Sequence, residues 1–251
     1  MFTSIRGLLT GAVAAGLVLG VLPAATATAG PVQMAAAHRK VFLPKKGEQF
    51  FKVPAGVTTM TFEMVGAGGG GGSGTWTSSY DGGNGGGAGA VVRCTLPVRP
   101  QTMLIAVGRG GVAGGSVRPG DTSDAAGGRA GATGATSLSG GPSKPLDFQV
   151  GVGHGNPGQS GYNNQGARDS KGATTAQCAS RGKAVQPDSS TAGGDGQPGR
   201  QVYGGAGGKT GTIPAGCPKG SGSGGKGGDS AKNNQLARGK HGGNGCVVLS
   251  W

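Results

Sequence analysis

Short runs of alternating apolar and polar residues recur along the chain and predict β-strands. The clearest run covers residues 57–65, where Met60, Phe62 and Met64 fall on one face. Successive side chains of a strand point to opposite faces, so this period is typical of a half-buried strand. Similar runs are residues 50–53, 91–98, 103–107, 146–152 and 246–251. Because no stretch beyond residue 30 has a sustained helical period, the pattern predicts an all-β fold, an antiparallel β-sandwich.

Glycine fills the segments between these runs and accounts for 60 of the 251 residues. Ordering a glycine costs roughly 0.5–1 kcal/mol more than ordering an alanine, so these segments need a compensating structure. The sequence has no sustained Gly-X-Y period, which excludes collagen. Runs such as 82–89 and 204–208 suit polyglycine II helices, extended left-handed helices whose amides bond to neighbouring helices. Disorder is the expectation for the least regular stretch, residues 168–193.

The N-terminal residues 1–29 have the features of a signal peptide. Arg6 provides a positive start, residues 8–22 are free of charge, and Ala27-Thr-Ala29 is a small-x-small cleavage pattern. A membrane anchor is the competing interpretation, but this run is shorter than the roughly 20 residues that span a bilayer. We therefore expect a secreted, extracellular protein, associated with a cell wall. The expected organisation is a signal peptide 1–29, a flexible segment 30–47 and one domain 48–251.

The chain is strongly basic, with 23 Lys and Arg against 10 Asp and Glu and a formal net charge of +13. In an exported protein this excess favours an anionic cell-wall polymer or glycan as partner over nucleic acid. The competing interpretation is that the charge only keeps a glycine-rich surface soluble. The oligomeric state does not follow from the sequence.

Four cysteines, an even number in an exported chain, favour two disulfides. Three pairings are open, and we favour Cys178 with Cys217 and Cys94 with Cys246. The first pair would lie within the glycine-rich region and the second between two strands. Because the chain has no C-x-x-C spacing, a zinc site is not expected.

Three separated blocks resemble bacterial and phage glycine-rich domain proteins. Residues 51–72 have the pattern of an aromatic residue, then Val-Pro-Ala-Gly-Val-Thr, an alternating strand and a glycine run. Residues 89–98 and 245–251 are similar to the family's second and closing strands. The resemblance implies a β-sandwich related in plan to tumour-necrosis-factor-like folds, from which packed polyglycine II helices project. It also implies a role in recognition, as in phage tail-tip adhesins and some receptor kinases.

Catalytic chemistry is not indicated, and we expect no enzyme activity. The chain has three histidines, lacks a G-x-S-x-G motif, and carries two glutamates after the leader. Residues 224–232 match the calcium-binding nonapeptide, but that motif works in stacked copies and occurs once here. No cofactor and no metal site are expected.

Aromatic residues within the glycine-rich excursions are the best candidates for binding. They are Trp76, Tyr80, Tyr162 and Tyr203. Such rings can stack on a sugar or enter a partner pocket, whereas the alternative is that they only cover glycine backbone. The sequence thus favours an adhesin-like binding module that uses loop tips and basic charge. The rival hypothesis is a passive structural protein of the cell envelope or extracellular matrix, without a discrete ligand.

Overall fold

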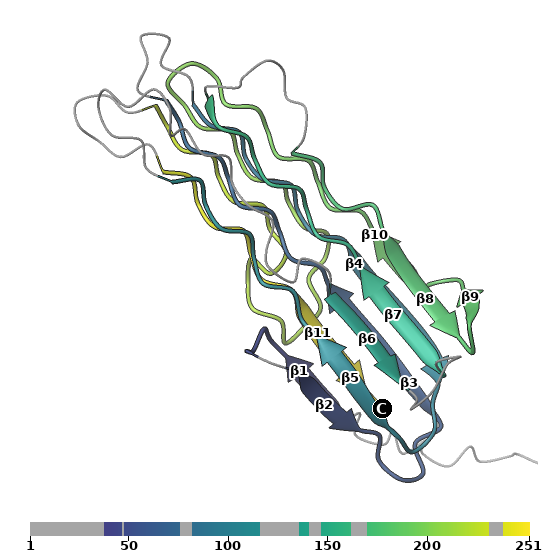
Figure 1. Cartoon of the computed structure of the whole chain (residues 1–251). Coiled ribbons are helices and arrows are strands. Elements are labelled where there is room, and N and C mark those ends of the chain that lie inside the picture. The colour runs from purple at the N-terminus through teal and green to yellow at the C-terminus, as the bar shows by residue number, and fades with distance from the viewer. Residues whose placement is uncertain are drawn as a thin grey trace, which may run out of the picture. The chain divides into compact units, whose positions relative to one another are not determined.

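The computed structural model describes residues 38–46, 48–75, 82–115, 136–140, 147–161, 170–230 and 238–251, and the expected signal peptide lies outside them. Within these ranges the fold is an antiparallel β-sandwich of two sheets (Figure 1). The first sheet has the order β1-β11-β3-β4-β10 and the second β2-β5-β6-β7-β8-β9. The strands are β1 (Arg39–Phe42), β2 (Gln49–Lys52), β3 (Thr59–Val65), β4 (Val91–Pro97), β5 (Thr102–Ala106), β6 (Thr136–Gly140), β7 (Phe148–Val152), β8 (Ala176–Ser180), β9 (Lys183–Val185), β10 (Ser189–Thr191) and β11 (Cys246–Ser250).

Inward-facing residues of both sheets form one hydrophobic core. Phe62 of β3 and Phe148 of β7 come from opposite sheets, and their ring centroids lie 5.3 Å apart. Met60 and Met64 are buried beside Phe62, which confirms the face that the alternation predicts. The predicted all-β sandwich is therefore observed, and its core lies where the alternating runs meet.

The folded part is larger than the sequence pattern indicates. Residues 39–42 fall in the segment 30–47 that was expected to be flexible, yet they form β1 and pair with β11. Disorder was expected for residues 168–193, yet β8, β9 and β10 lie there. These strands are short and poor in large apolar residues, so they hold their place through ladder hydrogen bonds with β7 and β4.

The two disulfides link Cys94 with Cys178 and Cys217 with Cys246. All four cysteines are bridged as expected, but the pairing that we favoured from the sequence is wrong. Cys94 in β4 and Cys246 in β11 are separated by β3, and two strand spacings of about 4.8 Å exceed the reach of a disulfide. Cys94 instead faces the core and meets Cys178 from the other sheet.

Glycine-rich segments continue from the strand ends and run side by side away from the sheets (Figure 1). We call them together the glycine array: 66–75, 82–90, 108–115, 153–161, 170–175, 193–200, 203–209, 222–230 and 238–245. Their backbone amides donate to carbonyl groups of neighbouring segments with a period of three. The N–H groups of Gly66, Gly69 and Gly72, for example, donate to the carbonyls of Ala90, Gly87 and Asn84.

Segment 82–90 lies at the centre of the array. Its amides donate to 222–230, 153–161, 193–200 and the following residue Gln201, and its carbonyls accept from 66–75, 170–175 and 203–209. With 222–230 the donor–acceptor pairs are Gly83 to Gly228, Gly86 to Gly225 and Gly89 to Gly222, at 2.8–2.9 Å. A buried backbone polar group without a partner is costly, and contact with six segments satisfies those of the centre.

Most glycines of the array leave no room for a side chain. A Cβ built on Gly86 would lie less than 3.0 Å from backbone atoms of Gly69 and Gly70. The same holds at Gly71 and Gly224, where the obstacle is again the backbone of another segment. Glycine is therefore required here for close approach of backbones, which explains why the composition is so extreme.

Candidate functional site at the far end of the glycine array

A tight turn, residues 200–203, closes one pair of array segments. The N–H of Arg200 donates to the carbonyl of Tyr203 at 2.9 Å, and the reverse bond has the same length. Tyr203 is 69% exposed, and Val202 beside it is also exposed. Because segment 193–200 starts just after β10, this turn lies at the end of the array remote from the sheets.

Other array segments end beside this turn. Gly82 and Ser230 donate their N–H groups to carbonyls of the turn, at 2.7 and 2.9 Å. Gly161 donates to the carbonyl of Ser73 at 2.9 Å. The far ends of these four segments and the turn, remote in sequence, therefore lie together in one region, which we call the tip: residues 73–75, 82, 161, 200–203 and 230.

Of the four aromatic candidates, Tyr203 is placed by the structure, and it lies in the tip. Trp76, Tyr80 and Tyr162 lie outside the described residues. Thr75 and Gly82 flank the segment that carries Trp76 and Tyr80. The prediction that these rings form a binding surface stays a prediction.

Several polar side chains of the array, among them Asn84, Asp195 and Asp229, accept hydrogen bonds from backbone amides of neighbouring segments. The donors are Gly199 for Asn84 at 2.9 Å, Gly172 for Asp195 at 2.8 Å and Gly204 for Asp229 at 2.8 Å. At Asn84 the side chain stands in for a backbone carbonyl and continues the three-residue period of the donors Gly193, Gly196 and Gly199. Sequence reasoning missed this role, although an Asn or Asp inside a glycine run is the signal for it.

The array lowers the pKa of both carboxylates among these side chains, Asp195 and Asp229. The hydrogen bond from the amide of Gly172, with the Lys171 ammonium at 3.1 Å, lowers the pKa of Asp195. For Asp229 partial burial acts to raise the pKa, but the Gly204 amide and the nearby Lys226 outweigh it and lower the pKa. Both groups are thus held in the charged form by the folded array.

Acid is therefore expected to destabilise the array through these two groups. A carboxyl whose pKa is lower in the folded state stabilises the protein above its unfolded pKa, near 3.8, and loses that contribution as the pH falls further. The double variant Asp195→Asn/Asp229→Asn keeps an oxygen acceptor without the charge. Thermal unfolding between about pH 5 and pH 2 should show a shallower decline for this variant than for the wild type. Equal pH slopes would contradict this prediction.

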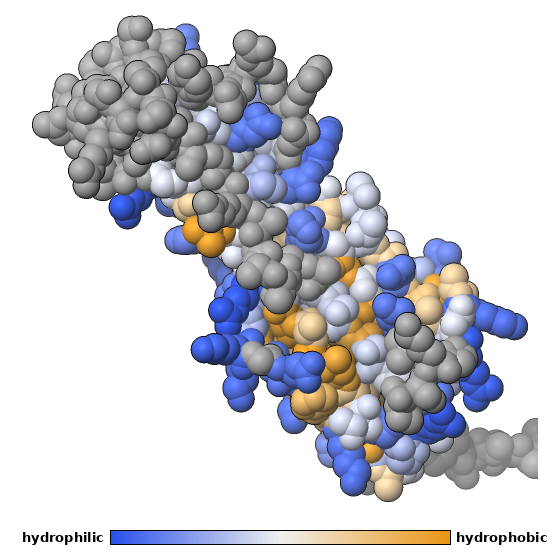
Figure 2. Space-filling view, in the orientation of Figure 1, coloured by the Kyte–Doolittle hydropathy of each residue, from blue (hydrophilic) through white to orange (hydrophobic). Residues whose placement is uncertain are grey.

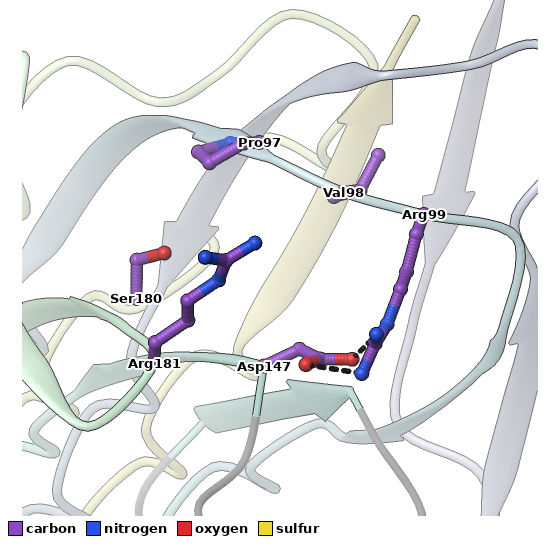
Figure 3. A pocket seen from close by; sticks show the side chains of 6 residues that line it. All are labelled: Pro97, Val98, Arg99, Asp147, Ser180 and Arg181. Atoms are coloured by element: carbon purple, nitrogen blue, oxygen red, sulfur yellow. Dashed lines mark hydrogen bonds and ion pairs between the residues drawn. The ribbon is translucent and has the colours of Figure 1, made fainter.

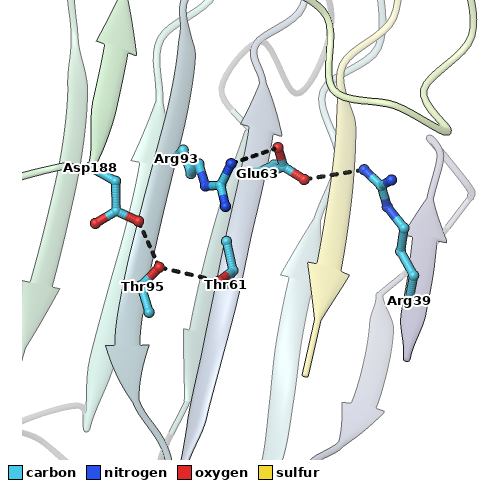
Figure 4. A network of polar contacts seen from close by, with 6 residues as sticks. All are labelled: Arg39, Thr61, Glu63, Arg93, Thr95 and Asp188. Carbon is cyan, nitrogen blue, oxygen red and sulfur yellow. Dashed lines mark hydrogen bonds and ion pairs between the residues drawn. The ribbon is translucent and has the colours of Figure 1, made fainter. Parts of the chain in front are cut away.

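The outer face of the first sheet carries a polar network (Figure 4). Glu63 lies between Arg39 and Arg93, at 3.1 and 4.0 Å. Thr95 donates to Asp188 at 2.6 Å and lies 3.2 Å from the hydroxyl of Thr61. The network joins β1, β3, β4 and the segment before β10, so its carboxylates are already used within the sheet. We assign it a structural role.

On the outer face of the second sheet, the residues of the central strands carry no charge. Phe50 and Leu104 form an exposed cross-strand pair at one side. Beyond them the outward positions hold small or uncharged side chains: Ala106, Ser137, Ser139, Gln149, Gly151, Gln177 and Ala179. Figure 2 shows apolar residues over these strands with hydrophilic residues along the margins. This face offers apolar area but no group that would recognise an anion.

Within the described ranges, no three His, Cys, Asp or Glu side chains gather closely enough to hold a metal ion. In the same ranges, no helix has the length and apolar character needed to cross a membrane.

A β-sandwich whose strand ends carry a hydrogen-bonded glycine array defines a class of glycine-rich β-proteins. The glycine-rich domain model matches residues 44–251, and the chain belongs to this family. The resemblance seen at three blocks of the sequence is thereby confirmed for the family. No curated protein matches the chain.

Proposed function

We propose that the protein is a secreted, adhesin-like binding module that recognises an anionic cell-surface or cell-wall polymer through the tip. The observation that carries this proposal is the convergence of array ends at the tip, with Tyr203 69% exposed among them. The segments that contain Trp76, Tyr80 and Tyr162 adjoin described array residues, Thr75, Gly82 and Gly161. A secreted protein of the bacterial or phage type, with a tumour-necrosis-factor-like sandwich plan, fits this role.

The array in this proposal consists of polyglycine II helices that hold the tip in place. The three-residue period of the amide donors supports this, because a helix of that type has three residues per turn. In the central segment 82–90 every amide donates to a neighbouring segment or to the turn, so the tip is attached to a stiff support. Binding residues that are held in position lose less conformational entropy when a ligand binds.

Uncompensated positive charge supports an anionic partner. Among the described acidic residues, Glu63, Asp147, Asp195 and Asp229 form ion pairs within the protein. Several lysines in the described ranges form none, including Lys45, Lys46, Lys183, Lys209 and Lys219. The surface therefore keeps its positive excess, which attracts acidic polymers over a distance set by ionic strength.

Removing the tip aromatics should weaken binding to cell walls. We expect the variant Trp76→Ala/Tyr80→Ala/Tyr203→Ala to bind sedimented bacterial cell walls about tenfold more weakly, because aromatic side chains dominate such contacts. Phe50→Ala removes an aromatic ring that is 58% exposed elsewhere, and it should leave binding unchanged. Co-sedimentation at a series of protein concentrations gives both affinities.

The same assay separates the proposal from a passive structural role. Walls chemically stripped of their anionic polymer, or walls in about 1 M salt, should retain much less protein. A protein without a discrete ligand would bind all these walls equally weakly, and the tip variant would match the wild type. Either result would contradict the proposed function.

A further inference from the structure

A small cavity lies at the end of the sandwich opposite the glycine array. Its volume is about 70 Å³, and it is lined by Pro97, Val98, Arg99, Asp147, Ser180 and Arg181 (Figure 3). These residues come from the end of β4 and the turn after it, the start of β7, and the β8–β9 hairpin. The cavity has room for one small chemical group.

Asp147 is fully engaged by Arg99. The Nε and Nη2 atoms of Arg99 donate to the two carboxylate oxygens of Asp147, at 2.7 and 2.6 Å. The backbone N–H of Arg181 donates to the carbonyl of Asp147 at 2.8 Å, which fixes the hairpin against β7. The charge of the Asp147 carboxylate is thus compensated by Arg99. The guanidinium of Arg181 leaves the lining of the cavity with one net positive charge.

Arg181 occupies a position that its turn does not favour. Arg181 and Gly182 have φ values of 50° and 73°, and they connect the paired residues Ser180 and Lys183. A two-residue hairpin turn with both central residues left-handed prefers Asn, Asp or Gly at its first position. A long side chain there is strained, so turn geometry does not explain this arginine.

The guanidinium of Arg181 is available to a ligand. Figure 3 shows it extending from the hairpin toward the strand end at Pro97 and Val98, on the side where Ser180 also lies. Within the described ranges it forms no ion pair, whereas Arg99 in the same cavity does. A guanidinium presents a planar fork of donors that matches carboxylate and phosphate oxygens.

We infer that Arg181 and Ser180, supported by the Arg99–Asp147 pair, form a subsite for a single carboxylate or phosphate group of an acidic polymer. The kind of polymer that carries this group is taken from the proposed function, on which this inference rests. The compensated carboxylate does not repel the anion, the guanidinium binds it, and the cavity has room for one such group. The module then contacts its polymer at two places, the tip and this subsite.

Titration of the ¹⁵N-labelled oxidised protein by NMR tests the subsite, with acetate and inorganic phosphate in separate arms at constant ionic strength. We expect saturable shifts at the amides of Arg181 and Gly182 and at the Arg181 Nε–H. The variant Arg181→Asn suits the turn and removes the guanidinium, so its affinity for the anion should fall at least tenfold. Lys209→Gln removes the same charge from the glycine array and should bind the anion as the wild type does. Arg181→Lys keeps the charge without the fork and should also bind more weakly.

Linear, unsaturated shifts, or equal affinity in Arg181→Asn, would overturn the inference. If small anions bind at Arg181 while cell walls do not bind the protein, the proposed function fails and the subsite stands. If walls bind through the tip and Arg181→Asn changes neither wall binding nor anion shifts, the subsite fails and the proposed function stands.

Discussion

Replacing Gly86 by alanine is expected to disrupt the glycine array and to lower the free energy of unfolding by roughly 3–5 kcal/mol. Gly86 lies in the central segment, where its N–H donates to Gly225 and its carbonyl accepts from Gly208, both at 2.8 Å. An added Cβ would overlap backbone atoms of Gly69 and Gly70, which cannot turn aside as a flexible side chain does. The segments 66–75 and 82–90 must then move apart, and their buried amides lose their hydrogen-bond partners.

Gly115→Ala is the matched control. An added Cβ at Gly115 meets nothing within 4 Å, so the change should alter the free energy of unfolding by less than about 1 kcal/mol. Urea unfolding followed by circular dichroism gives both values, and amide exchange of the array segments reports where Gly86→Ala opens the structure. Equal stability of the two variants would contradict the close-packed backbone array.

Removing the disulfide between Cys94 and Cys178 is expected to have the second large effect. The sequence separation is 84 residues, and closing such a loop stabilises by roughly 4.6 kcal/mol in the chain-entropy model. The bridge between Cys217 and Cys246 spans 29 residues, which corresponds to roughly 3.6 kcal/mol. The double variant Cys94→Ala/Cys178→Ala should therefore be less stable than Cys217→Ala/Cys246→Ala.

The core position of the first bridge adds to this difference. Cys94 and Cys178 are buried between the sheets, so alanine at both positions also leaves unfilled volume. Non-reducing peptide mapping checks the pairing directly, and urea unfolding of each double variant ranks the bridges. Linked peptides that contain Cys94 and Cys246, or the reverse order of stabilities, would contradict the structure.

Strong alternation made part of the fold predictable. Residues 57–65 and 91–98 each carry three large or sulfur-containing side chains on one face, and the structure places them in the core as β3 and β4. β6 and β8 were missed because the sequences Thr-Ser-Leu-Ser-Gly and Ala-Gln-Cys-Ala-Ser show little contrast between faces. Small residues of this kind form strands only when neighbouring strands provide ladder partners.

The cysteine pairing shows a limit of reasoning from sequence position. Cys178 and Cys217 both lie in the glycine-rich half, which suggested that they meet. In the structure Cys178 faces the core from the second sheet, whereas Cys217 packs against the outside of the first sheet beside Cys246. Proximity here depends on strand order, which a single sequence does not reveal.

The candidate sites were predictable to different degrees. An aromatic ring in a glycine-rich run is visible in the sequence, and Tyr203 is indeed exposed at the tip. Arg99, Asp147 and Arg181 are remote in sequence and carry no motif, so only the fold brings them to one cavity. An Arg-Gly pair between alternating residues was the available signal, because it marks a hairpin turn with an unusual first residue.

The central position of segment 82–90 determines when the protein can fold. Its hydrogen-bond partners extend from residue 66 to residue 228, so the segment cannot complete its bonds until most of the chain is present. Contacts between residues so distant in sequence slow folding, because long loops must close before the contacts form. Late completion of these bonds agrees with the export proposed above, because transport through a narrow membrane channel requires a chain that has not yet folded.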